Sequence, residues 1–336
     1  MGPWTMHLTR AFAQSLAIIM VLACGAILAF GAEPASAQSY PNRPIHLLLG
    51  LPPGGAADVT ARLVARGLED KLGQTVVVEN KPGSGGNLVG QLVANAPPDG
   101  YTLLIGPDTL FVVNPHLYAN MPFNPLKDFI PIASLISNYF AFAVSSTLPV
   151  KTLPDFVALA KRSNPPLLYA SFGNGTQSHL GVEMLKQIAQ FDLTHVPYRG
   201  APQAGVGVVS GDASITFGGG GVYPLIQAGQ LRPLAVASRE PIDELPGVPS
   251  ASEYYPSYDV SSWQGLFAPA GTPQAVIDRL RAATNEVIAD KAFDAKLRAT
   301  LSGKSYQSTP EAFAAQIKSE NEKYGALIRT LNLRIQ

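Results

Sequence analysis

The chain has 336 residues, no formal net charge, 14% charged and 46% hydrophobic residues, and it contains 31 glycines and 29 prolines. This composition excludes a disordered chain, which would be more polar. It also argues against a basic nucleic-acid binder and a polybasic membrane-surface protein. The length allows two domains or one large one.

The first residues predict an exported protein. Arg10 precedes a hydrophobic run over 11–32, and Ala35-Ser36-Ala37 then provides the small residues of a signal-peptidase site. We expect a signal peptide over 1–37, cleaved to leave a soluble periplasmic protein starting near Gln38. An uncleaved membrane anchor is the alternative, because the run is nearly long enough to span a bilayer. Cys24, the only cysteine, lies in this run, where lipidation is a further alternative.

Strand and helix patterns alternate after residue 38. Buried strands over 45–50 and 75–80 flank an amphipathic helix over 59–72, in which Val59, Leu63 and Leu68 share the apolar side and Gly73 ends the helix. A glycine-rich turn, a helix over 88–96 and a strand over 101–106 follow. We interpret these elements as a doubly wound parallel sheet with right-handed crossovers.

A second cycle begins at 131–145 and continues with helix and strand patterns to residue 238. A return strand over 258–271 and two helices finish the chain, and Thr272-Pro273 and Thr309-Pro310 are typical of an N-cap followed by the first helical residue. We therefore predict two α/β lobes, one of residues 38–138 plus 262–336 and one of 139–261. Two crossings, near 138 and 261, imply a hinge and a cleft at the carboxyl ends of the strands.

Two strand–helix junctions carry groups suited to an anion. Gly54 and Gly55 permit a tight turn before a helix, where free N–H groups and the helix dipole favour negative charge. A structural cap is the alternative role for Asp58. In the second lobe, hydroxyl, amide and N–H groups follow a strand, and an ordinary polar loop is the alternative there. Two such loops on facing lobes favour a bound dianion.

Motifs for a reactive centre are incomplete. Leu88 replaces the third glycine of a dinucleotide fingerprint, and Ser171 lacks the first glycine of a nucleophile elbow. The histidines beyond the leader have no metal-ligand spacing, and no carboxylate pair suits acid–base catalysis. We expect His179 to form a hydrogen bond at a helix start, and a role as base for Ser171 or Ser178 is the alternative. The sequence thus offers recognition groups, without a cofactor, metal or catalytic set.

Six ordered stretches carry a family resemblance: GLPPGGAADVTARLVA, VVVENKPGSGGNLVGQLVA, PPDGYTLLIG, NPHLY, THVPYRGAPQA and GLFAPAGTPQAVIDRL. The mature chain resembles the periplasmic solute-binding proteins of tripartite tricarboxylate transporters, the Bug family. The resemblance implies a type II periplasmic-binding-protein fold, α/β with two doubly wound lobes. It also implies a monomeric receptor that captures an organic anion and delivers it to a membrane permease. An exported ligand sensor and a secreted serine hydrolase are the alternatives.

The resemblance also implies the ligand site. The residues that match the family pattern, or line the expected pocket, come from both lobes: Pro53, Gly54, Gly55, Ala56, Asp58, Asp108, Thr109, Ser171, Asn174, Gly175, Thr176, Gln177, Tyr198, Phe217 and Gly218. Many relatives place an aspartate after the strand that ends near Phe217, where it can pair with an ammonium group, but here a glycine run over 218–221 follows. We therefore expect a dicarboxylate without an amino group, long-chain or aromatic ligands included.

Overall fold

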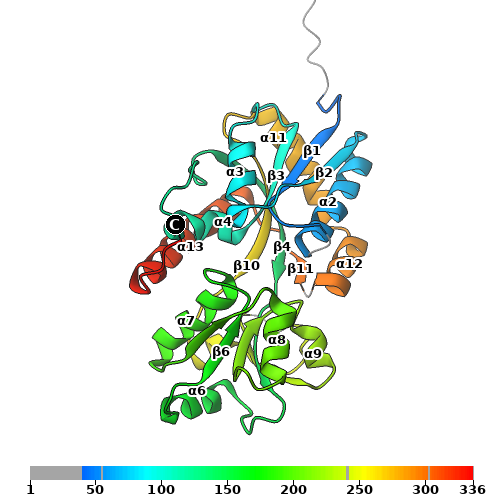
Figure 1. Ribbon diagram of the computed structural model, residues 1–336. Coiled ribbons are helices and arrows are strands. Elements are labelled where there is room, and N and C mark those ends of the chain that lie inside the picture. Colours follow the sequence, from blue (N-terminus) through cyan, green and yellow to red (C-terminus); the bar gives the residue numbers. More distant parts are fainter. Residues whose placement is uncertain (1–39, 54–55, 240–241, 302, 336) are drawn as a thin grey trace, which may run out of the picture. The chain divides into compact units, whose positions relative to one another are not determined.

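The computed structural model describes residues 40–53, 56–239, 242–301 and 303–335, so the predicted signal peptide lies outside the described residues. From Arg43 onward the chain builds two β-sheets, each with its own helices (Figure 1). We call the elements of the first sheet and its helices lobe 1 and those of the second sheet lobe 2. Among the helices in the described ranges, none is long and apolar enough to span a membrane.

The six-stranded sheet of lobe 1 has the order β11-β4-β10-β3-β1-β2. Its strands are β1 (Ile45–Leu49), β2 (Val76–Asn80), β3 (Thr102–Pro107), β4 (Phe129–Asn138), β10 (Ser262–Pro269) and β11 (Gly303–Ser305). β1 pairs with β2 and β3 in parallel, whereas β10 and β11 pair with their neighbours antiparallel. The prediction of a parallel sheet is therefore right for the first three strands only, because β10 returns from lobe 2 in the opposite direction.

The helices of lobe 1 come from both ends of the described chain. They are α2 (Ala56–Leu72), the short helix η1 (Ser84–Gly86), α3 (Asn87–Ala94), α4 (Asp108–Val112), α5 (Asn114–Leu117), α11 (Gln274–Ile288), α12 (Lys291–Leu301) and α13 (Pro310–Thr330). α11 packs against α2 and β4, and α13 packs against α4, α5 and β4. The C-terminal helices thus pack on the sheet to which the N-terminal strands belong, and they complete lobe 1.

Lobe 2 has a five-stranded sheet with the order β7-β6-β8-β5-β9. Its elements are β5 (Ala141–Ser145), α6 (Leu153–Arg162), β6 (Leu168–Ser171), α7 (Gln177–Ala189), β7 (Thr194–Pro197), α8 (Ala201–Val209), β8 (Ile215–Gly218), α9 (Tyr223–Gln227), β9 (Leu231–Val236) and α10 (Ala251–Tyr254). β6 is parallel to β7 and β8, so the loops after these strands emerge at one edge of the sheet.

The chain crosses between the sheets twice, and the two crossing segments are neighbours. β4 ends at Asn138 and β5 begins at Ala141, while β10 begins at Ser262. Ser262 is the partner of Asn138 in the register between β10 and β4. These positions support lobe boundaries at 138 and 262, which we propose as the domain division.

Local helix predictions were partly right. In α2, Leu68 is fully buried as predicted, but Val59 and Leu63 are only half-buried, and the buried stripe runs through Ala61 and Val64. The buried face of α2 is therefore rotated relative to the predicted one, and alanines rather than the larger Val59 and Leu63 form part of it.

The two Thr-Pro helix starts differ in the structure. Thr309 caps α13 as predicted, because its side chain accepts a hydrogen bond from the backbone N–H of Ala312 at 3.1 Å. Thr272 does not cap α11. Its Oγ1 donates to the carbonyl oxygen of Pro269 at 2.8 Å, Pro273 is the N-cap, and the helix begins at Gln274.

Candidate functional site

The junction between β6 and α7 forms a tight loop with a capped helix start. Gly173 and Gly175 have φ values of 132° and 72°, a backbone conformation that favours glycine. Thr176 is the N-cap of α7: its Oγ1 accepts from the backbone N–H of His179 and donates to the carbonyl oxygen of Gly173 at 2.7 Å. We call residues 172–178 the α7 tip.

The backbone N–H groups of the α7 tip fall into two sets. The N–H of Gly173 donates to Ser171 Oγ at 3.1 Å, and the N–H of Gly175 donates to His179 Nδ1 at 3.1 Å. Within the described part of the chain, the N–H groups of Asn174, Gln177 and Ser178 have no acceptor. The 13-residue helix α7 therefore has unpaired N–H donors at its N-terminus, the positive end of the helix dipole, which is the arrangement that binds anions.

Two stacked histidines lie behind the α7 tip. The rings of His179 and His195 are 4.2 Å apart at their centroids and 4° from parallel, and Tyr169 stacks on His195 at 4.8 Å. Ser171 Oγ lies 2.6 Å from His195 Nε2. Burial lowers the pKa of His179 to about 3 and also lowers the pKa of His195. Both imidazoles are therefore neutral near pH 7.

His179 forms the hydrogen bond at the helix start that the sequence favoured, and the alternative role as a base for Ser171 or Ser178 is wrong. His179 Nδ1 accepts the Gly175 N–H instead, Ser178 Oγ donates to the carbonyl oxygen of Phe217, and the histidine beside Ser171 is His195. His195 follows on the next strand, so only the parallel pairing of β6 with β7 brings it to Ser171. Ser171 is completely buried.

Asp108 joins the two lobes. It begins α4 and is buried, and its carboxylate accepts hydrogen bonds from the N–H of Thr109 at 2.6 Å, from Gln177 Nε2 at 3.0 Å and from the N–H of Trp263 at 3.2 Å. Burial, with the nearby charge of Glu320, raises the pKa of Asp108 to about 7. The oxygens of Asp108 therefore accept three N–H hydrogen bonds, and the donor Gln177 belongs to lobe 2.

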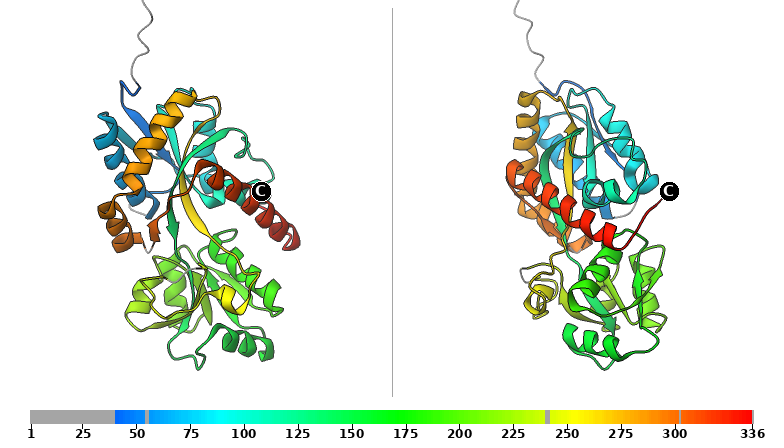
Figure 2. Two further views of the ribbon diagram at one scale, coloured as in Figure 1. Left: turned by 180° about the vertical axis from the view of Figure 1, so that it is seen from behind. Right: turned by 90° about the vertical axis from the view of Figure 1, so that its left-hand side faces the viewer.

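Gln177 is held from two sides by lobe 1. Besides its bond to Asp108, its Oε1 accepts a hydrogen bond from the hydroxyl of Tyr324 on α13 at 2.9 Å. Sequence reasoning missed Tyr324, because nothing in a helical pattern indicates a partner 147 residues away. Figure 2 shows α13 at the boundary between the two lobes, as this contact requires.

Asp58 fixes the start of α2. Arg62 donates to both of its oxygens at 3.0 Å, and Asn80 Nδ2 donates to its Oδ1 at 3.0 Å and to the carbonyl oxygen of Leu51 at 3.0 Å. The carboxylate thus links the loop after β1 to the end of β2. Pro53 is exposed and Ala56 begins α2, whereas Gly54 and Gly55 lie outside the described residues.

The remaining candidates lie on both lobes. Thr109 is half-buried beside Asp108. The ring of Tyr198 lies against α8, where a Cβ atom on Gly207 would be 2.3 Å from the tyrosine hydroxyl. Phe217 is completely buried and stacks near Phe142 with ring centroids 4.5 Å apart.

The glycine run after β8 serves close packing. A Cβ atom on Gly218 would lie 2.6 Å from Val222, and one on Gly219 would lie 2.6 Å from the carbonyl oxygen of Tyr139. A Cβ atom on Gly221 would lie 2.8 Å from Ala201 and from Pro202. Neighbouring atoms therefore occupy the space that side chains would fill at these three positions.

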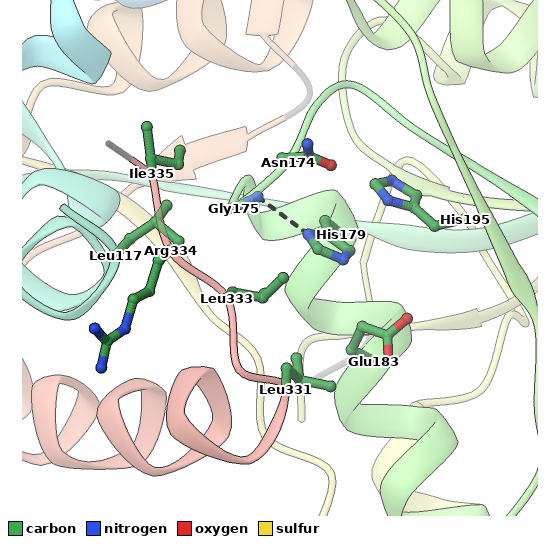
Figure 3. Close-up of a pocket in the computed structure, with 10 residues that line it drawn as sticks. All are labelled: Leu117, Asn174, Gly175, His179, Glu183, His195, Leu331, Leu333, Arg334 and Ile335. Atoms are coloured by element: carbon green, nitrogen blue, oxygen red, sulfur yellow. Dashed lines mark hydrogen bonds between the residues drawn. The ribbon is translucent and has the colours of Figure 1, made fainter. Parts of the chain in front are cut away.

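A cavity of about 350 Å³ lies between the lobes beside the α7 tip (Figure 3). Its lining combines polar groups of lobe 2 with the C-terminal segment and α5 of lobe 1: Asn174, Gly175, His179, Glu183, His195, Leu117, Leu331, Leu333, Arg334 and Ile335. Figure 3 shows the hydrogen bond from Gly175 to His179, with the C-terminal segment running past it. The structure thus joins Ser171, Asn174, Gly175, Thr176 and Gln177 in one loop and connects that loop to Asp108.

Residues 60–333 match the sequence profile described as the tripartite tricarboxylate transporter family receptor. The chain belongs to this family. It is 34% identical over 322 residues to a UPF0065 protein of Bordetella bronchiseptica, covering 96% of this chain and 95% of the relative. It is 30% identical over 308 residues to the protein BugT of Bordetella pertussis, covering 91% of this chain and 94% of BugT.

Solved structures agree with this membership. A periplasmic transporter that is 33% identical superposes with a TM-score of 0.76, covering 89% of this chain and all of the other. A protein of R. palustris solved with adipate is 27% identical, with a TM-score of 0.76 and coverage of 88% and 100%. MatC from Rhodopseudomonas palustris with bound malate is also 27% identical, with a TM-score of 0.72 and coverage of 86% and 100%.

Family membership separates a receptor from an enzyme. The protein is a periplasmic solute-binding receptor of the tripartite tricarboxylate transporter family, and the predicted type II periplasmic-binding-protein fold is confirmed. The family and its solved members are receptors rather than enzymes. The serine hydrolase alternative is therefore wrong, and the close contact of Ser171 with His195 has a structural explanation in the receptor.

Proposed function

We propose that this receptor binds an organic dicarboxylate without an amino group between its lobes and delivers it to the membrane permease of a tripartite tricarboxylate transporter. The observation that carries the proposal is the set of untied N–H groups on Asn174, Gln177 and Ser178 at the α7 tip. These donors lie where Gln177 and Gly175 contact lobe 1. A carboxylate there receives charge-assisted hydrogen bonds and the favourable end of the helix dipole.

The charges around the α7 tip support a ligand without an ammonium group. Asp58 is paired with Arg62, and the oxygens of Asp108 accept from three N–H donors. An ammonium group would have to compete with these partners for either carboxylate. Two relatives were solved with adipate and with malate, both of which are dicarboxylates without an amino group.

The second carboxylate of the ligand is assigned to lobe 1. We place it at the start of α2, a 17-residue helix whose first turn follows Gly54 and Gly55. A ligand held by both helix starts favours a closed arrangement of the lobes, to the extent that it binds this arrangement more tightly. The permease then recognises the closed, monomeric receptor. Uptake of the bound acid into permease-containing vesicles, dependent on added receptor, tests this delivery step against a signalling role.

The sharpest test of the α7 tip uses two substitutions at one position. Gln177 is the first residue of α7, where proline is accepted because the N–H makes no helical bond, and Thr176 already has the extended backbone that precedes proline (φ −73°, ψ 161°). Gln177→Pro removes the side chain and the N–H donor, whereas Gln177→Ala removes only the side chain. The comparison of the two therefore isolates one backbone donor.

Calorimetric titration with adipate, malate, aspartate and glutamate provides the measurement. We expect the wild-type receptor to bind at least one plain dicarboxylate and neither amino acid. We expect Gln177→Pro to bind the dicarboxylate about 10-fold more weakly than Gln177→Ala, as the loss of a hydrogen bond to a charged group predicts. Tight binding of aspartate or glutamate alone would contradict the ligand class. Equal affinities of the two variants would contradict the assigned donor.

A further inference from the structure

We propose that His179 and His195 are positioning residues that hold the α7 tip in its anion-binding arrangement, and that both act as neutral imidazoles. This inference rests on the proposed function, because the α7 tip supplies the donors for the ligand carboxylate. Neither histidine is assigned a contact with the ligand. His179 accepts a hydrogen bond from the α7 tip directly, and His195 acts on the tip through the Ser171 hydroxyl.

The hydrogen bond at His179 determines its tautomer. Its Nδ1 accepts the N–H of Gly175 at 3.1 Å, so Nδ1 carries no proton and Nε2 carries the only one. An imidazolium at this position would place two N–H groups opposite one another. The bond to Gly175 therefore exists only while His179 is neutral.

His195 acts on the other glycine through a hydroxyl. Ser171 Oγ accepts the N–H of Gly173 at 3.1 Å and lies 2.6 Å from His195 Nε2. The imidazole thereby fixes the position of the hydroxyl, and the hydroxyl fixes Gly173. Both glycines have left-handed φ values and would otherwise sample many conformations.

The hydrogen bonds made by the N–H groups of Gly173 and Gly175 determine which backbone N–H groups of the α7 tip remain available for a ligand. Gly173 and Gly175 flank the exposed Asn174, whose N–H remains untied, and α7 begins two residues later with the untied N–H groups of Gln177 and Ser178. Because the N–H groups of Gly173 and Gly175 bond to protein acceptors, the three other N–H groups remain as hydrogen-bond donors for a ligand. Without the bonds at the two glycines, the Gly175 N–H would be free to turn and the loop would lose its single arrangement.

The surroundings keep both rings neutral. The rings stack at 4.2 Å, where two positive charges would repel each other, and the ring of Tyr169 lies 4.8 Å from His195 and 6.4 Å from His179 between centroids. Glu183 and Lys186 of α7 form an ion pair nearby at 2.9 Å, and Lys186 also pairs with Asp192 at 3.2 Å. Arg334, from the C-terminal segment, lines the same cavity. Burial lowers the pKa of each histidine in this setting.

Matched substitutions separate the hydrogen bond from the volume of the ring. His179→Asn keeps an acceptor near the Nδ1 position, and His179→Phe keeps a ring without an acceptor. His195→Gln keeps a polar group near the Nε2 position, and His195→Leu removes it. We expect adipate or malate affinity within about 3-fold of wild type for the Asn and Gln variants, and at least about 10-fold weaker for the Phe and Leu variants.

Amide hydrogen exchange gives a readout that needs no variant. In the wild-type receptor without ligand, the amides of Gly173 and Gly175 should exchange much more slowly than the amide of Asn174. Fast exchange at both glycines would overturn the inference even if a variant fails to fold. Equal dicarboxylate affinity in all four variants would also overturn it, while leaving the proposed function intact. A wild-type receptor that binds no carboxylate would instead refute the proposed function.

Discussion

At the residue scale, Asp108 differs from an ordinary surface carboxylate in its burial and in its raised pKa. It accepts the backbone N–H of Trp263, while Glu320 of α13 accepts the indole N–H of Trp263 at 2.8 Å. Two buried carboxylates therefore accept hydrogen bonds from Trp263 near the start of β10, one of the two crossing segments. Burial and the charge of Glu320 raise the pKa of Asp108 to about 7.

This pKa predicts the sign of one pH effect on stability. The folded-state pKa of Asp108 lies above the ordinary value of 3.8, so between these values the folded state binds a proton that the unfolded chain does not. The contribution of Asp108 to the free energy of unfolding should therefore rise as the pH falls from 8 to 5. For one group, the slope is at most about 1.4 kcal/mol per pH unit.

Urea unfolding of the wild type and of Asp108→Asn across this pH range checks the effect. Subtracting the two curves removes the contribution of His179, which has the opposite sign because burial lowers its pKa. We expect the wild type to gain stability relative to the variant as the pH falls. Curves that run parallel from pH 8 to pH 5 would show that Asp108 does not titrate there.

At the element scale, the contact between the α7 tip and α5 depends on one glycine. Gly175 has φ 72°, and a Cβ atom on it would lie 2.3 Å from Leu117 Cδ2. Gly211 provides a comparison because it has φ 89°, but a Cβ atom on it would have no neighbour within 4 Å in the described part of the chain. Both positions strain an alanine backbone, and only Gly175 adds a collision with the other lobe.

Gly175→Ala should therefore be more harmful than Gly211→Ala. We expect Gly211→Ala to lower the free energy of unfolding by about 1 kcal/mol and to leave dicarboxylate affinity unchanged. Gly175→Ala should cost at least about 2 kcal/mol and weaken binding. Adding Leu117→Ala to Gly175→Ala should restore part of the affinity. Identical effects of the two glycine substitutions on stability and binding would contradict the role of this contact.

The sequence predicted the β6–α7 junction because its signals are local. A buried strand pattern, a polar loop with glycines and a helical pattern follow one another within a few residues, so Asn174 and Thr176 were predicted to lie between a strand and a helix. The histidine bonds were not predictable in this way. His195 is 24 residues from Ser171 and reaches it through strand pairing, so its role depends on register rather than on a motif.

At the scale of the whole unit from Arg43 onward, the lobes are linked by more than the crossing segments. Tyr324 of α13 donates to Gln177 of lobe 2, and Gln177 donates to Asp108. Lys323 and Glu320 of the same helix bind the segment that leads into β10, through Asp259 and Ser261. α13 thus contacts both a crossing segment and the α7 tip.

Removing the Tyr324 hydroxyl should change binding without disturbing either lobe. Tyr324→Phe loses a hydrogen bond between lobes worth about 1 kcal/mol, so we expect dicarboxylate affinity to fall about 5-fold. Tyr306→Phe is the matched control, because the Tyr306 hydroxyl donates to Gln316 within lobe 1. Calorimetric titration of both variants with the dicarboxylate measures the two affinities. An equal loss in the control, or no loss in Tyr324→Phe, would contradict a link between the lobes at this site.

The sequence predicted two lobes and two crossings because alternating patterns and their order are visible along the chain. It could not predict that β10 makes the first sheet mixed, nor that Asp108 pairs with Gln177, since both follow from how distant segments meet. The glycines of the run after β8 adjoin Val222, Tyr139 and Pro202, and these close contacts between segments are likewise not visible in the sequence.

A crystal structure of the receptor with the dicarboxylate that binds most tightly tests the central claim most directly. We predict one carboxylate within hydrogen-bond distance of the N–H groups of Asn174, Gln177 or Ser178, and the other near the start of α2. A ligand bound elsewhere, with these three donors facing solvent, would contradict the account.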